Sequence, residues 1–99
     1  MIRGTTPTLA FTLPFDTESV VELYVTFVQN SRVIAERSLE ECEVEGRTVK
    51  VHFTQADTLA FAPGKQVEMQ MRVKFDDGAA VASEIITTSV DRTLKDGAI

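Results

Sequence analysis

The 99 residues are enough for one hydrophobic core and too few for two, so we expect a single domain over residues 1–99. Hydrophobic residues make up 43% and charged residues 25% of the chain, which is typical of a folded protein and excludes a disordered one. The net charge of −5 disfavours nucleic acid as a partner, because no basic stripe offsets the repulsion from phosphates.

The N-terminal residues mix Thr with scattered apolar residues and contain no continuous apolar run. We therefore expect neither a signal peptide nor a membrane-spanning segment. The alternation of Leu9, Phe11 and Leu13 with polar or small residues then predicts a first short strand, which Pro14 ends. Pro7 in front of it indicates an edge strand or a strand start.

The second predicted strand covers residues 21–27, where apolar residues occupy every odd position. Residues 29–31 form a turn, because Asn and Ser favour reversals of the chain. The chain then returns as a strand over residues 32–37. Its phase is ambiguous, since either Ile34 or its two apolar neighbours could face the core.

Residues 38–45 are rich in Glu, which predicts a solvent-exposed loop with a short strand at residues 42–44. Val49, Val51 and Phe53 alternate with polar residues and predict the next strand.

Residues 54–57 have the spacing of a capping box, with Thr at the first position and Asp at the fourth. They predict one short helical turn near residues 55–60. Leu59 and Phe61 would then close the end of the core. Residues 62–65 carry Pro and Gly at the second and third positions, as a type II turn requires.

The clearest pattern begins after this turn and predicts a β-hairpin over residues 65–90. Five apolar residues share one face of its first strand: Val67, Met69, Met71, Val73 and Phe75. Charged and amide side chains cover the other face, which is typical of an antiparallel sheet with one dry and one wet face. Residues 76–78, Asp-Asp-Gly, reverse the chain, with Gly78 free to adopt a positive φ.

The register of this hairpin follows from what each turn places on the dry face. A two-residue turn would set Glu84 opposite Met71 and bury a carboxylate, which is costly. A three-residue loop with a bulge at Gly78 sets Ser83 opposite Met71 instead, and we favour it. This register leaves Ile86 and Val90 on the solvent side.

Apolar residues on a wet face more often indicate an interface than chance. The predicted interface residues are Val28, Ile86, Val90 and Leu94. Residues 91–99 lose the alternation and are predicted to form a tail or a partner-binding arm. As an alternative, this tail could itself cover the final strand.

The short strands, the turn residues between them and the lack of a helical period predict an all-β fold. We expect an immunoglobulin-like antiparallel β-sandwich of about seven strands. The Cys…Trp…Cys pattern of antibody domains is absent, so this prediction concerns architecture alone.

The residue types that carry chemistry are sparse. Cys42 is the one cysteine, and the glutamates around it should raise its pKa and leave the thiol inert. His52 is the one histidine and falls on the wet face of its strand. No triad, zinc cluster or phosphate-binding loop is apparent, so we predict neither a cofactor, a metal nor an enzyme. A hydrolase would need carboxylates that converge in a pocket.

Four segments resemble small phage and prophage proteins of Gram-positive bacteria. They are residues 1–8, residues 11–16, Tyr24-Val25-Thr26-Phe27 and residues 54–59. The start of the chain is also similar, more loosely, to the N-terminal β-sandwich domain of phage baseplate upper proteins. That resemblance implies a domain that docks a receptor-binding apparatus to the tail.

The function predicted from the residues and this resemblance is that of a non-enzymatic phage structural protein. Its expected partners are other tail or baseplate proteins or further copies of itself, and not a membrane. The resemblance implies a virion component that is assembled in the bacterial cytoplasm. The alternative is a carbohydrate-binding or host-surface-binding module, although the absence of Trp and the single Tyr disfavour it.

Overall fold

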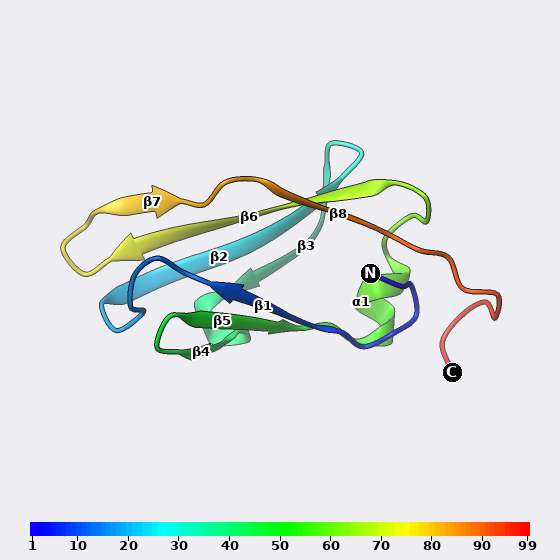
Figure 1. The fold of residues 1–99 in the computed structure, drawn as a ribbon, viewed down its shortest axis with the longest axis horizontal. Helices are drawn as coiled ribbons and strands as arrows, with labels where there is room; N and C mark the ends of the chain where they lie inside the picture. Colours follow the sequence, from blue (N-terminus) through cyan, green and yellow to red (C-terminus); the bar gives the residue numbers. More distant parts are fainter.

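The computed structural model describes residues 1–99 and shows two antiparallel sheets packed face to face, which confirms the all-β sandwich (Figure 1). The smaller sheet has the order β1 (Thr8–Thr12), β5 (Thr48–His52), β4 (Glu43–Glu45). The larger sheet has the order β3 (Arg32–Ser38), β2 (Val20–Gln29), β6 (Gln66–Phe75), and both β7 (Ala80–Ala82) and β8 (Ile86–Ser89) pair with the outer edge of β6.

This strand order is that of an immunoglobulin sandwich without its first strand. In that fold strands B, E and D belong to one sheet, and strands C′, C, F and G belong to the other. Here β1, β5 and β4 take the places of B, E and D, while β3, β2 and β6 take those of C′, C and F. β7 and β8 share the place of strand G. β1 is therefore an edge strand, as Pro7 in front of it indicated.

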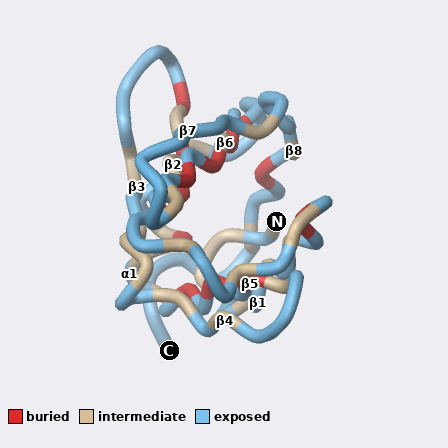
Figure 2. Tube along the Cα trace, turned by 90° about the vertical axis from the view of Figure 1, so that its left-hand side faces the viewer, coloured by how far each residue is buried: buried red, intermediate tan, exposed pale blue.

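The core lies between the sheets, where the inward faces of β2, β5 and β6 meet. Figure 2 shows buried stretches in both layers of the sandwich. The alternation in β6 is confirmed, because Val67, Met69, Met71 and Val73 are all buried. The ring of Phe27 from the larger sheet meets that of Phe53 near the smaller sheet edge-on, with centroids 4.9 Å apart. Such aromatic contacts join the layers.

Two bulges change which residues face the core. The pairing of β2 with β6 shifts just after Val20, so Val21 is 49% exposed, although the alternation groups it with the buried Leu23 and Val25. A second shift lies in the β2–β3 pair, where Ile34 and Ala35 both become partly buried and pack on the core. Val33 is 62% exposed. The ambiguous phase of β3 thus reflects a real irregularity.

The predicted hairpin turn is confirmed. Residues 76–78 form a three-residue loop closed by a hydrogen bond from Phe75 N–H to Ala79 O (2.8 Å), and Gly78 has φ +89°. Val73 lies directly opposite Val81, as the bulged register requires.

The edge strand changes register again after β7, which the sequence did not reveal. Ser83 exchanges hydrogen bonds with Met71, its hydroxyl accepting from Met71 N–H at 3.0 Å, yet Ile86 already lies opposite Met69. One extra residue therefore separates β7 from β8. Ile86 and Val90 face the inner side as a result, so the predicted face was wrong for both, although Ile86 remains exposed at the sheet edge. Val90 is 2% exposed and belongs to the core.

The start of the chain runs beside the end of β8. Ile2 pairs in parallel with Asp91, and the amino group of Met1 donates to Ser89 O at 2.9 Å. Met1 packs against the core. The N-terminal segment, and not the C-terminal tail, thus lies along this strand. The tail itself returns to the helical turn, where the Gln55 side chain bonds both N–H and C=O of Ile99.

Two short helical elements complete the fold. The 3₁₀ turn η1 (Leu39–Glu41) carries the chain from β3 to β4, and α1 (Gln55–Leu59) carries it from β5 to β6. The capping box predicted for α1 is present. Phe61 is buried at the end of the core, as predicted, whereas Leu59 is only partly buried.

Candidate functional site

The most apolar hollow of the surface is a groove of about 220 Å³ along one side of the sandwich. We call it the edge groove. Its lining includes four consecutive residues of and after β1, from Ala10 to Leu13, together with Met69, Met71 and Ile86. Because consecutive residues of a strand point to opposite faces, the groove must follow the backbone edge of β1. It therefore lies between the free edges of the two sheets.

Of the four predicted interface residues, only Ile86 lies in the edge groove. Its side chain is 47% exposed even though it faces the inner side. Val90, as described above, is buried and offers nothing to a partner. Leu94 lies in the tail and is 91% exposed. The structure thus separates residues that were predicted to belong to one interface.

Val28 lies on the opposite, outer face of the larger sheet. Together with Thr26 and Ile85 it lines a hollow of about 130 Å³. Ile85 is exposed because the extra residue before β8 places it on the outer face while its neighbour Ile86 faces inward. Two adjacent isoleucines therefore serve two different surfaces.

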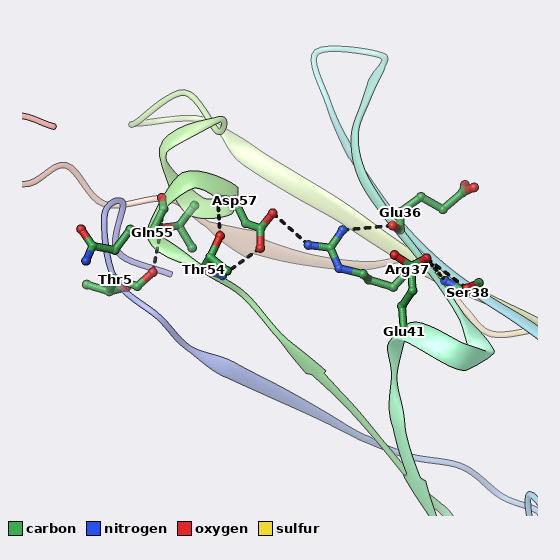
Figure 3. Close-up of polar contacts among 9 residues, drawn as sticks. Thr5, Glu36, Arg37, Ser38, Glu41, Thr54, Gln55 and Asp57 are labelled. Atoms are coloured by element: carbon green, nitrogen blue, oxygen red, sulfur yellow. Dashed lines mark hydrogen bonds and ion pairs between the residues drawn. The ribbon is translucent and has the colours of Figure 1, made fainter. Parts of the chain in front are cut away.

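On the opposite side of the sandwich, an ion pair joins a strand of the larger sheet to the helical turn that follows β5. Arg37 of β3 donates to the carboxylate of Asp57 in α1 at 2.9 Å, with side-chain exposures of 17% and 26% (Figure 3). The same guanidinium lies 5.3 Å from the centroid of the Phe53 ring. It also donates to Glu36 O at 3.0 Å. These contacts link the larger sheet to the helical turn that leaves the smaller sheet.

Asp57 also completes the capping box of α1. Its carboxylate accepts from Thr54 N–H at 2.8 Å, and the Thr54 hydroxyl accepts from Asp57 N–H (Figure 3). Partial burial raises the pKa of Asp57, but the hydrogen bonds from Thr54 and Arg37 outweigh it, so the pKa lies below its usual value. The ionised form is therefore the one that the fold stabilises.

Cys42 is partly buried against the core, whereas His52 is exposed and hydrogen-bonded to its neighbours. The pKa of the Cys42 thiol is raised, as predicted, although burial is the main cause and the charge of Glu41 comes second. His52 bonds Glu43 at 2.9 Å through Nε2 and the Thr8 hydroxyl at 2.9 Å through Nδ1, all on the exposed face of the smaller sheet. The hydrogen bond from His52 lowers the pKa of Glu43.

Sequence reasoning missed two polar residues that fix the shape of the molecule. Gln29, predicted as part of a turn, is 3% exposed, and its amide bonds both N–H and C=O of Ala62. Its odd position continues the inward phase of β2 and could have revealed it. Arg3 donates to Leu59 O and Phe61 O at the end of α1, and no local pattern indicates this contact.

His, Cys, Asp and Glu side chains do not gather in groups of three or more that could hold a metal ion. Neither helical element has the length and apolar character needed to cross a membrane. No protein-family model, curated protein or solved structure matches the chain. The edge groove and the apolar residues around it are therefore the features from which a function can be argued.

Proposed function

We propose that this chain is a non-enzymatic structural protein of a phage or prophage, associated with the tail or baseplate. It acts by binding other tail proteins or further copies of itself. The observation that carries this proposal is the edge groove, an apolar surface that runs between the two sheets. Apolar surface of this kind favours contact with protein.

The residues beside the groove support the same function. Val81 of β7 pairs with the buried Val73, so it lies on the same face as Ile86, and it is exposed along the same sheet edge. The resemblance of the N-terminal segment to phage proteins supports the phage context. Because β1 and β7–β8 are edge strands, a partner could add backbone hydrogen bonds to this apolar contact.

A sugar-binding module is supported less well by the same surface. Sugar sites combine aromatic platforms with several converging polar groups. The edge groove contains one aromatic side chain, Phe11, and its lining is mainly aliphatic or thioether. Carbohydrate binding is therefore the alternative function, and direct evidence of sugar binding would replace the proposal.

The test is whether the chain is a component of purified phage particles. Particles are purified after induction from the bacterium that encodes the chain, and their proteins are identified by mass spectrometry. We expect the chain to copurify with tail or baseplate proteins, to be lost from particles in the Ile86→Asp variant, and to be retained in Ile85→Asp, its control on the outer face.

Two results would contradict this proposal. One is absence of the unmodified chain from particles that contain complete tails. The other is specific binding of the purified chain to host cell-wall sugars on a glycan array, which would favour the alternative.

A further inference from the structure

The free backbone groups of β1 can be assigned from the hydrogen bonds at its two ends. Pro7 O accepts from Phe53 N–H, and Leu13 N–H donates to Arg47 O, so both residues point their backbone groups toward β5. Backbone groups of successive residues alternate between the two edges of a strand. The N–H and C=O groups of the even-numbered residues Thr8, Ala10 and Thr12 therefore point to the open edge, and all three residues are exposed.

This edge lacks the charges that normally prevent strands from pairing between molecules. Natural edge strands are protected by charged side chains, especially Lys, or by Pro within the strand. Residues 5–15 contain no charged residue. The edge strands on the other side do, with Arg32, Glu36 and Arg37 in β3 and two glutamates in β4.

Charge also limits where two copies of an acidic chain can meet. At a net charge of −5, two copies repel one another, and an antiparallel contact between two β4 strands would bring glutamates together. The β1 edge adds no like charges to the contact. Of these two edges, the β1 edge is therefore the one at which two copies can meet at the lower electrostatic cost.

The sequence of β1 is also complementary to itself. In an antiparallel pair centred on Ala10, Thr8 lies opposite Thr12 of the other copy, and Ala10 lies opposite Ala10. All three outward-pointing residues then form hydrogen-bonded pairs, each of which exchanges two N–H···O bonds. Such a pair has the twofold symmetry of an isologous dimer.

In this same register, the apolar side chains on the inner face of the two β1 strands also lie opposite one another. Leu9 of one copy lies opposite Phe11 of the other, and both side chains point to the core side of the sheet, where they pair with Val51 and Val49 of β5 in their own chain. The partner's strand would thus bring two apolar side chains to the side on which Ile86 and Met71 line the edge groove.

We propose that the open edge of β1 pairs with the same edge of a second copy, joining two small sheets into one continuous sheet across a twofold axis. This inference specifies the partner and surface for the protein contacts of the proposed function, on which it rests. The edge groove then lies at the interface between the two copies.

Sedimentation velocity on the purified full chain tests the inference with two matched variants. Ala10 lies opposite Lys50 in β5 and Ala80 lies opposite Lys74 in β6, so a Glu at either position faces a Lys within its own chain. In the proposed dimer Ala10→Glu sets two carboxylates opposite each other, and we expect more than about tenfold weaker association. Ala80→Glu should associate as the unmodified chain does. Circular dichroism checks that both variants are folded.

Three results would overturn the inference: an unmodified chain that stays monomeric at its highest soluble concentration, a folded Ala10→Glu variant that dimerises unchanged, or a loss of the dimer in Ala80→Glu alone. A monomeric chain that still copurifies with phage tails would overturn the dimer and leave the proposed function in place. A dimer that is absent from phage particles would overturn the proposed function and leave the dimer in place.

Discussion

The two sides of the sandwich are built differently. On one side, β3 and β4 carry charged residues, η1 joins them, and the Arg37–Asp57 ion pair holds α1 against β3. On the other side, β1 and the β7–β8 edge carry no charge within their strands and leave the edge groove between them. We refer to these as the closed side and the open side.

A sandwich of one domain can thus protect some of its edges and leave others open. Charged edge strands prevent pairing between molecules, and the closed side follows that rule. The open side departs from it where the chain also exposes apolar side chains such as Ile86. This local departure from the rule is the reason that we propose a binding surface on the open side.

The largest effect is expected where the open side meets the core. Met71 lines the edge groove but is only 3% exposed, so Met71→Asp would bury a carboxylate. We expect a loss of more than about 4 kcal/mol and an unfolded domain. Arg72→Asp, on the exposed face next to it, should change stability by less than about 0.5 kcal/mol. Similar thermal melts of the two variants would show that the faces of β6 are assigned wrongly.

A pair of aromatic truncations compares the interior with the open side directly. Phe27 is fully buried, and Phe27→Ala should cost about 3–5 kcal/mol in the free energy of unfolding. Phe11 at the open edge is only partly buried, so Phe11→Ala should cost less, about 1–2 kcal/mol. Urea unfolding of dilute, monomeric protein measures both values. Equal losses would mean that the open side is packed as tightly as the core.

The closed side should respond to acid through Asp57. Because the folded-state pKa of Asp57 is lowered, its carboxylate contributes stability above the unfolded pKa of about 3.9, and this contribution is lost as the pH falls through the lower folded pKa. Asp57→Ala should therefore cost about 1–2 kcal/mol at pH 7 and progressively less below pH 4.

Asp96→Ala in the tail is the control for this pH series, since Asp96 is exposed and belongs to neither of the chain's two ion pairs. Urea unfolding between pH 7 and pH 3 measures both variants. A cost of Asp57→Ala that does not change with pH would mean that the Arg37 contact contributes through packing alone.

The smallest effect on stability is expected for Ile86, which is about half exposed. Ile86→Thr should change the free energy of unfolding by less than about 1 kcal/mol but weaken association between copies. Ile85→Thr, on the outer face, should leave association unchanged. If Ile85→Thr weakens association more than Ile86→Thr does, the outer face and not the groove is the contact surface.

Local patterns were enough to predict the sandwich, the capped helical turn and the Asp-Asp-Gly hairpin. Each depends on neighbouring residues: alternation in β6, the Thr54–Asp57 spacing, and Gly78 at the bulge. In these elements the favoured local conformation and the final fold agree.

The errors arose where one residue was inserted without a local signal. The extra residue before β8 reverses the phase of the final strand, so Val90 moves from the predicted surface to the core. Because strand side chains alternate with period two, one insertion inverts every later assignment. Ser83 stabilises this irregularity through its hydroxyl, a contact that depends on the position of β6.

The edge groove could not be predicted for a related reason. It is formed by β1, β6 and the β7–β8 segment, and β1 is far from the other two in the sequence and meets them only through the strand order. The absence of charged residues over residues 5–15 can be read directly from the sequence. Its meaning depends on β1 being an edge strand, which the topology establishes.

Amide hydrogen exchange at increasing protein concentration tests the central claim most directly, since it reads the open edge of β1 residue by residue. If two copies pair at this edge, the amides of Thr8, Ala10 and Thr12, which point away from β5, become protected as concentration rises, while the outer edges of β3 and β4 do not change. Protection that appears on β3 or β4, or at none of these edges, would contradict it.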